Sequence, residues 1–212
     1  MELIPSIQEY AGLPIPHHVM KWLLKEYEQP NDKIHNLLKK GILEQVKKGL
    51  YIAGPAITKS KPEPFLVANH ILGPSYVSLE SALSYYNLIP ERVYTITSVT
   101  TKAPRVYTTP IGSFTYTRLQ LPYYSYGIRS IELAPQQRIM IASPEKAILD
   151  KIVTTAGVEF RSKSGALSYL EEDLRIDTDQ LSQLDLRSMA DWISFGPKKQ
   201  SLQFLLETLQ RL

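Results

Sequence analysis

Two side chains in this sequence have a spacing typical of acyl-transfer enzymes. Ser143 and Lys146 form an S-x-x-K motif, in which a serine attacks a carbonyl group beside a lysine, as in penicillin-binding proteins and β-lactamases. Residues 163–165, Lys-Ser-Gly, resemble the K-[ST]-G element of those enzymes. The single Tyr-x-Asn, Tyr85 to Asn87, however, precedes the serine where it should follow it. We therefore do not predict acyl-transfer chemistry here.

The same serine fits a structural role at the start of a helix. A serine is a preferred N-cap, and a proline at the next position loses no hydrogen bond, because the first helical N–H has no partner within the helix. Glu145 adds a negative charge near the positive end of the helix dipole. We therefore predict that a helix begins at Pro144 and that Ser143 caps it.

Other kinds of catalytic or metal site find no support in the sequence. Restriction-type nucleases place a carboxylate two residues before a lysine, and no lysine of this chain has one. The acidic cluster at 171–173 fits a solvated helix face, and no phosphate-binding glycine loop is present. Cysteine is absent, and the four histidines lack the i, i+4 spacing of zinc ligands: His17, His18, His35 and His70. We predict no enzyme, no cofactor and no metal site.

Basic side chains are concentrated between residues 33 and 48, a segment that contains five lysines and a single acidic residue, Glu44. Lys33, Asn36 and Lys40 follow an i, i+3, i+7 row, which aligns them on one side of a helix. Cations can bind DNA phosphates, and an amide can read an adenine edge. We predict a DNA-binding surface made of Lys33, His35, Asn36, Lys39, Lys40, Lys47 and Lys48.

The apolar pattern around these residues predicts the elements that position them. Ile34, Leu37 and Leu38 recur at helical spacing, and Gly41 is suited to end the helix. Residues 42–46 and 50–52 are strand-like and flank a Lys-Lys-Gly turn. A helix followed by a basic hairpin is the outline of a winged helix.

An earlier helical pattern lies within residues 17–29, and its predicted apolar side consists of Val19, Trp22, Leu23 and Tyr27. The stretch between Tyr10 and Met20 is broken by proline and glycine, which departs from a regular helix-turn-helix.

Residues 54–63 are rich in proline, glycine, serine and lysine and predict a linker. We therefore place a DNA-binding domain at 1–54, a linker at 55–63 and a second domain at 64–212. Beyond the linker, helical spacing over Phe65–Leu72 precedes a helix that Ser78 could cap. Residues 92–142 read as antiparallel strands with hairpins, and helical patterns follow to the C-terminus. The predicted class is α+β, with a winged helix-turn-helix followed by a larger α+β domain with a mostly antiparallel sheet and C-terminal helices.

The net charge of the chain is only +3, so its distribution is more informative. Residues 1–60 contain 8 basic and 6 acidic residues, and residues 61–144 contain 7 basic and 4 acidic ones. Residues 145–212 contain 9 basic and 11 acidic residues, so only this last part is acidic. No apolar run predicts a membrane span, and residues 1–12 lack the pattern of a signal peptide. We predict a cytoplasmic protein that does not bind membranes.

Tyrosines are concentrated at "LPYYSYGI", which holds Tyr123, Tyr124 and Tyr126. Tyrosine with basic neighbours can stack on single-stranded nucleic acid, but it also fills half-buried sheet surfaces and protein interfaces. With only two arginines near, we predict that these tyrosines are exposed for sheet or protein contact. The terminal leucines 202, 205, 206 and 209 are predicted to lie in the core.

Several segments occur in the order found in a known family. They are "KKGILEQVKKGLYIAGP", "VANHILGPSYVSLESALSYYNLIPE", "SVT", "GSFTYTRL" and "IASPEKAILDKI". Together they resemble the AbiEi family of antitoxins from type IV toxin-antitoxin, or abortive infection, systems. The resemblance covers about residues 30 to 155, and "GPSYVSLESAL" and "SPEKAILD" are its more specific parts.

The resemblance implies an N-terminal winged helix that binds inverted repeats in its own promoter, so that double-stranded promoter DNA is one partner. It also implies a C-terminal domain that counteracts a nucleotidyltransferase toxin, the second partner. The expected function is a DNA-binding antitoxin and transcriptional autorepressor. The alternative is a winged-helix transcription regulator with no toxin partner, and a neighbouring toxin gene separates the two.

Overall fold

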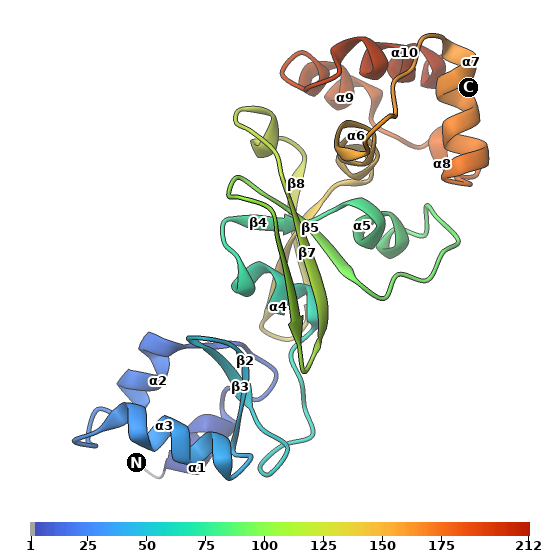
Figure 1. The fold of residues 1–212 in the computed structure, drawn as a ribbon. Helices are drawn as coiled ribbons and strands as arrows, with labels where there is room; N and C mark the ends of the chain where they lie inside the picture. The colour runs from blue at the N-terminus through green and yellow to red at the C-terminus, as the bar shows by residue number, and fades with distance from the viewer. Residues whose placement is uncertain (1–2) are drawn as a thin grey trace.

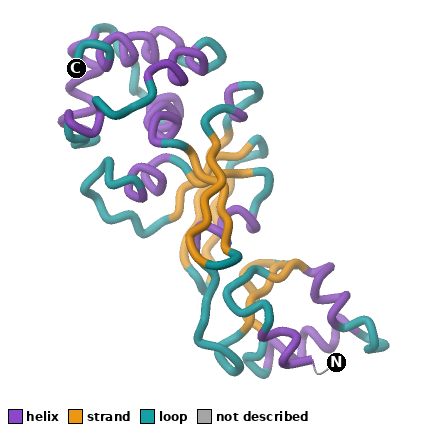
Figure 2. Tube along the Cα trace, turned by 180° about the vertical axis from the view of Figure 1, so that it is seen from behind, coloured by secondary structure: helices purple, strands orange, loops and turns teal. Residues whose placement is uncertain are grey.

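The computed structural model describes residues 3–212 and confirms the predicted α+β class. Figure 1 shows a winged helix at one end, a sheet in the middle and a group of helices at the other end. Seen from behind, the strands form the centre of the molecule between two helical ends (Figure 2). Among the described residues, none of the helices is long and apolar enough to cross a bilayer.

The first part of the chain is a winged helix-turn-helix. Its elements are, in chain order, α1 (Leu3–Gln8), β1 (Ile15–Pro16), α2 (His17–Leu23), α3 (Pro30–Lys39), β2 (Leu43–Lys47) and β3 (Leu50–Ala53). The three strands form an antiparallel sheet in the order β1-β3-β2. We call the hairpin of β2, its turn and β3 the wing. Helix α3 holds the position of the recognition helix.

The stretch broken by proline and glycine is the third strand of this sheet. Ile15 lies opposite Tyr51, and Pro16 lies opposite Leu50. Because proline has no N–H to donate, it is tolerated only in a short edge strand, and β1 is two residues long. The next N–H, that of His17, donates to the carbonyl of Gly49 at 2.9 Å, which fixes the start of α2 against the turn of the wing.

The predicted apolar side was right for Val19 and Leu23, which are partly buried against the core of the winged helix, and wrong for Trp22 and Tyr27. Met20 and Leu24 are fully buried, whereas Trp22 is 57% exposed and Tyr27 is 39% exposed. Tyr27 lies outside α2, which ends at Leu23, so the helical periodicity does not extend to it. The predicted end of α3 is confirmed: Gly41 has φ +66°, and the N–H groups of Gly41 and Ile42 donate to Leu38 and Leu37 in a Schellman motif.

Strand β3 of the wing is buried on both faces. Side chains of a strand alternate between its two faces. Tyr51 and Ala53 pack in the core of the winged helix with Ile34 and Leu37, whereas Leu50, Ile52 and Val46 belong to the core of the second domain. The same strand therefore supplies side chains to both cores. Residues 54–63 form no helix or strand and run between β3 and α4, in the place of the predicted linker.

The second domain is built on a six-stranded sheet in the order β6-β7-β5-β4-β9-β8. Three neighbouring pairs are antiparallel, and the pairs β4–β9 and β5–β7 are parallel. The strands are β4 (Ser75–Val77), β5 (Ile96–Thr100), β6 (Arg105–Thr109), β7 (Gly112–Arg118), β8 (Ile128–Ala134) and β9 (Gln137–Ala142).

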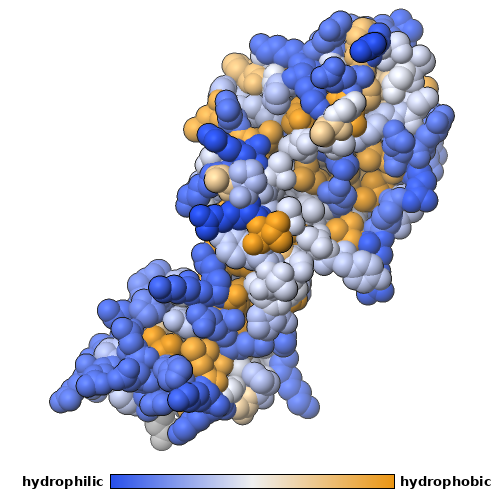
Figure 3. Space-filling view, viewed as in Figure 1, coloured by the Kyte–Doolittle hydropathy of each residue, from blue (hydrophilic) through white to orange (hydrophobic). Residues whose placement is uncertain are grey.

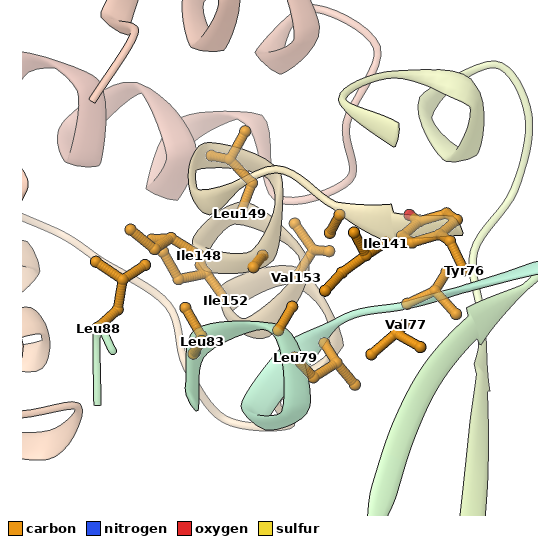
Figure 4. Packing of buried hydrophobic residues seen from close by; sticks show 14 of the residues in the cluster. Tyr76, Val77, Leu79, Leu83, Leu88, Ile141, Ile148, Leu149, Ile152 and Val153 are labelled. Carbon is orange, nitrogen blue, oxygen red and sulfur yellow. The ribbon is translucent and has the colours of Figure 1, made fainter. Parts of the chain in front are cut away.

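Helices cover both faces of this sheet. Helix α4 (Pro64–Ile71) lies on one face, where the Tyr116 hydroxyl of β7 donates to the carbonyl of Ala68 at 2.6 Å. Tyr76 of β4 is opposite Val99, and Tyr116 is opposite the adjacent Ser98, so the two tyrosines point to opposite faces. Helices α5 (Leu79–Tyr85) and α6 (Pro144–Thr154) pack against each other beside β4 and β9, as Figure 4 shows.

An ion pair between Lys146 and Asp150 lies in this core with both side chains fully buried. The other carboxylate oxygen of Asp150 accepts hydrogen bonds from the Tyr76 hydroxyl at 2.9 Å and the Ser78 hydroxyl at 2.8 Å. The ammonium of Lys146 also lies 3.6 Å from the ring centroid of Tyr123. Burial lowers the pKa of Lys146, although the Asp150 carboxylate opposes that change. Burial and Asp150 together raise the pKa of Tyr76 well above its usual range.

The two predicted helix caps have different outcomes. The Ser143 hydroxyl accepts a hydrogen bond from the Lys146 N–H at 3.3 Å, and Pro144 is the first residue of α6, which confirms the structural role of S-x-x-K. Ser78 occupies the N-cap position of α5, but its side chain makes no cap hydrogen bond. The predicted cap was wrong: the Ser78 hydroxyl is directed to the buried Asp150 carboxylate, to which it donates a hydrogen bond, and it accepts none from the first turn of α5.

Helices follow α6 to the end of the chain: α7 (Lys163–Ser168), a π-helical turn (Tyr169–Asp173), α8 (Thr178–Leu181), α9 (Leu186–Ile193) and α10 (Lys199–Leu209). The four terminal leucines are buried, as predicted, and the acidic residues 171–173 are solvent-exposed. The Lys198 ammonium donates to the carbonyls of Ile152, Thr155 and Val158 at 2.6–3.0 Å, which ties this region to the end of α6.

The prediction that three neighbouring tyrosines are exposed was wrong for two of them. Tyr123 is 2% exposed and Tyr124 is 8% exposed, and both belong to the main core. Tyr123 covers the Lys146 ammonium, and Tyr124 packs against Tyr76 with ring centroids 5.0 Å apart. Only Tyr126 reaches the surface, where it stacks on Phe195 at 5.1 Å.

The buried ion pair predicts a large effect on stability. Asp150→Ala leaves the Lys146 charge unpaired and removes the acceptor of two hydroxyl groups, so we expect the free energy of unfolding to fall by about 3–5 kcal/mol. The matched control is Glu132→Ala, which breaks an exposed ion pair with Arg138 and should cost less than about 1 kcal/mol. Urea unfolding followed by circular dichroism measures both. Equal losses in the two variants would contradict the prediction.

Candidate nucleic-acid interface

Helix α3 exposes two different rows of side chains because its buried residues, Ile34 and Leu37, leave two flanks open. The flank that faces the wing begins with Asn31. Together with Ile34, it lines a groove of about 380 Å³ whose other wall is His17, Lys48, Gly49 and Tyr51. At a spacing of four residues, Asn31 is followed by His35 and Lys39, both exposed. The turn of the wing and the N-terminal end of α2 therefore meet at this flank.

The row predicted from the sequence lies on the other flank. Lys33, Asn36 and Lys40 line a groove of about 440 Å³ that is closed by Leu3, Ile4 and Pro5 of α1 and by Tyr27. Lys33 is half-buried, and its ammonium lies 4.5 Å from the ring centroid of Tyr27. The structure therefore separates the seven predicted residues into groups on different sides of α3 and does not bring them together.

The two wing lysines also differ in their surroundings. The Lys47 ammonium donates to the carbonyl of Ile71, the last residue of α4, at 2.5 Å. It also lies 5.9 Å from the ring centroid of Tyr107 in β6. Lys48 is exposed at the turn beside His17 and Asn31. Lys47 is thus a contact between the domains, and only Lys48 is placed like the cation of a DNA-binding wing.

Several cations of the winged helix are available for an anionic partner. Within the described part of the chain, none of Lys33, Lys39, Lys40 and Lys48 takes part in an ion pair. Lys39 is the only lysine in the row of Asn31, His35 and Lys39, and Lys48 lines the groove between this flank and the wing. The N-terminal residues of a recognition helix are the ones that contact base edges, and cations at its rim bind phosphates. The wing-facing flank has both parts.

Sequence reasoning missed Asn31 and His17 at this flank. His17 reaches the groove because β1 directs the chain past the wing, and its Nδ1 lies 3.5 Å from the Tyr51 hydroxyl. A two-residue strand containing proline gives no periodic signal, so the position of His17 could not be read from the pattern. Asn31 could have been found, because its spacing from His35 and Lys39 is helical.

Comparisons with known proteins give the fold and no more. No protein-family profile matches the sequence, and no curated protein matches it. The crystal structure of the RV2827C protein from Mycobacterium tuberculosis is similar, with a TM-score of 0.63 and 14% sequence identity. The similarity covers 98% of this chain and 75% of that one, so it extends over both domains. At this identity it supports the architecture and says nothing about ligands.

The different surroundings of the two wing lysines predict different effects on DNA binding. Lys48→Ala removes a cation from the groove and should lower the magnitude of the salt slope of duplex binding by about 0.9. Lys47→Ala should leave this slope unchanged and lower the free energy of unfolding by about 1.5 kcal/mol, because it removes the hydrogen bond to Ile71. Titrations at several salt concentrations, together with urea unfolding, measure both quantities. A smaller slope in Lys47→Ala would show that this side chain leaves α4 to bind DNA.

Proposed function

We propose that this protein is a DNA-binding antitoxin and transcriptional autorepressor that counteracts a cognate nucleotidyltransferase toxin in the cytoplasm. The observation that carries the DNA-binding part is the groove between α3 and the wing. Asn31 of the recognition helix and His17 at the start of α2 line this groove with the exposed Lys48 of the wing, and none of the described residues that line it carries a carboxylate. Such a surface suits duplex DNA, with the amide of Asn31 directed at bases and Lys39 and Lys48 directed at phosphates.

The promoter with inverted repeats, as expected for the AbiEi family, is the proposed DNA partner. In this proposal the wing-facing row reads the sequence. The other predicted residues, Lys33, Asn36 and Lys40, lie on the flank toward α1, where the two lysines contribute positive charge. Lys47 is left out of the DNA contact because its ammonium is bonded to α4.

The antitoxin part rests on the resemblance of "GPSYVSLESAL" and "SPEKAILD" to the AbiEi family. These two segments meet in the structure, where Tyr76 and Ser78 of the first donate hydrogen bonds to Asp150 of the second. They therefore form one structural unit of the second domain, which supports a shared architecture with that family. The toxin-facing surface is not among these residues, because they are buried.

Sequence discrimination tests the DNA-binding proposal. Asn31→Ala should reduce the preference for the promoter over an unrelated duplex by about 1–3 kcal/mol if the amide holds an adenine. Asn36→Ala is the matched control, because it removes the same group from the flank toward α1 and should keep the preference. Fluorescence titrations of both duplexes give the two affinities. If Asn36→Ala loses the preference and Asn31→Ala keeps it, the reading row is the one that the sequence predicted.

Neutralisation of the toxin can be tested separately from DNA binding. The variant of the 212-residue chain with His35, Lys39 and Lys48 changed to Ala should lose promoter binding and still restore growth when co-expressed with the proposed cognate nucleotidyltransferase. Full-length protein is needed because Val46, Leu50 and Ile52 belong to the core of the second domain. Failure of the parent protein to restore growth would remove the antitoxin assignment and leave the regulator with no toxin partner.

A further inference from the structure

The second domain carries an open apolar groove between the start of α4 and the start of β5. Its volume is about 450 Å³. Most of the side chains that line it are apolar or aromatic, and they include Phe65, Tyr85, Val93, Tyr94, Ile96 and Ile111. Tyr94 is 78% exposed and Tyr85 is 38% exposed, although both are large aromatic residues. An apolar hollow with exposed rings is typical of a contact with another molecule.

The most exposed ring of the groove already attracts a cation. The Arg92 guanidinium lies 5.4 Å from the ring centroid of Tyr94, as expected for the electron-rich face of an aromatic ring. Phe65 and Tyr85 meet edge to face behind it, with ring centroids 6.1 Å apart. Tyr94 belongs to neither core. Its ring can therefore enter a pocket of a partner without disturbing the fold.

The charged residue that lines this groove is a carboxylate. Glu63 occupies the N-cap position of α4, but its side chain makes no cap hydrogen bond. Within the described part of the chain, Glu63 also takes part in no ion pair. An apolar groove with one uncompensated carboxylate suits a basic partner, and it repels the phosphates of DNA.

Acidic side chains extend the negative charge along the border of the groove. Five exposed acids, none of them in an ion pair with another described residue, lie in one short segment: Glu171, Glu172, Asp173, Asp177 and Asp179. Arg175, the one cation of this segment, pairs with Glu91. The side-chain amide of Gln180 donates to the carbonyl of Asn87 at 2.9 Å. The acidic segment therefore lies against the chain that leads from α5 into the groove.

The groove and the acidic segment lie on the same side of the second domain. Figure 1 shows α8 beside the long segment that joins α5 to β5. From the same viewpoint, Figure 3 shows apolar residues among strongly hydrophilic ones over this part of the domain. An apolar centre with a charged rim is the usual composition of a protein interface.

The charge of this surface distinguishes between possible protein partners. A two-fold contact with a second copy of this chain would place the same acidic patch against itself, which is unfavourable. An enzyme that transfers nucleotides, in contrast, needs basic side chains to bind triphosphates and nucleic acid. The nucleotidyltransferase of the proposed function therefore carries charge of the complementary sign.

We propose that the groove around Tyr94 and Glu63, bordered by the acidic segment 171–179, is the surface on which the second domain binds the toxin. Tyr94 is the anchor of this contact, and the carboxylates pair with basic side chains of the toxin. This inference rests on the proposed function and deepens it, because it makes neutralisation a direct contact. The DNA-binding groove between α3 and the wing has no residue in this surface.

The first test removes the anchor. Tyr94→Ala in the 212-residue chain should weaken binding to the purified toxin by at least about tenfold, because a central aromatic anchor is lost. The matched control is Trp22→Ala on the winged helix, which removes a ring that is 57% exposed and lies 5.8 Å from the Lys25 ammonium. This control should bind the toxin like the parent. Titration calorimetry measures both affinities.

The second test removes charge from the same surface. Glu63→Gln with Glu172→Gln should weaken toxin binding and make it less dependent on salt, because two attractive charges are lost. Glu26→Gln with Glu28→Gln removes the same charge from exposed positions of the winged helix and should behave like the parent. Circular dichroism checks that each variant is folded, and promoter titrations should give parent affinity for the Tyr94 and Glu63 variants.

The outcomes separate this inference from the proposed function. Parent toxin affinity in the Tyr94 and Glu63 variants overturns the inference, and so does a parent protein that restores growth without forming a complex with the toxin. In both cases the antitoxin assignment stands. If Tyr94→Ala abolishes a dimer of the parent in gel filtration and leaves toxin affinity unchanged, the groove is a contact between copies, and the inference is overturned. Failure of the parent to restore growth removes the antitoxin assignment itself, and the inference falls with it.

Discussion

The second domain depends on one buried electrostatic contact, the ion pair of Lys146 and Asp150. A charge without solvent is costly unless each of its hydrogen-bonding sites is occupied. Here the carboxylate receives Tyr76 and Ser78, which come from β4 and from the start of α5, and the ammonium lies over the ring of Tyr123. These partners are up to 74 residues apart in the sequence. The pair therefore fixes how α6, β4 and the loop before β8 meet. It also joins two segments that are distant in the sequence, "GPSYVSLESAL" and "SPEKAILD".

The second constraint is the wing, whose strand β3 is buried on both faces. The apolar run Leu50-Tyr51-Ile52-Ala53 reflects this, since a strand with two covered faces has no polar alternation. The contact of Lys47 with the end of α4 adds a hydrogen bond at the same joint, where a cation is favoured by the negative end of the helix dipole. As a result, the direction of α3 relative to the central sheet is set by packing, and the flexible-looking segment 54–63 does not decide it.

Local patterns in the sequence correctly predicted the helix ends that depend only on neighbouring residues. The helix from Ile34 ends at Gly41 because only the left-handed conformation closes its last turn, and Ser143 with Pro144 starts α6 by capping chemistry that needs no distant partner. Patterns failed where a distant group decided the outcome. Ser78 was predicted to cap a helix, but its hydroxyl donates a hydrogen bond to the distant Asp150 carboxylate. Tyr123 was predicted to be exposed, but its ring packs over the Lys146 ammonium in the core. The side of α3 that faces the wing likewise depends on β1, and a strand of two residues is too short to be predicted from a periodic pattern.

Sharing one strand between two cores limits how this protein can change during evolution. A winged helix transferred from another protein would have to bring side chains that fit α4 and β6, because Val46, Leu50 and Ile52 would otherwise leave a mismatched cavity in the neighbouring domain. Recombination at the linker is therefore disfavoured, although the linker looks like a natural crossover point. In the proposed function, new DNA targets would be reached more easily by point substitutions on the exposed flank of α3, because Asn31, His35 and Lys39 belong to neither core.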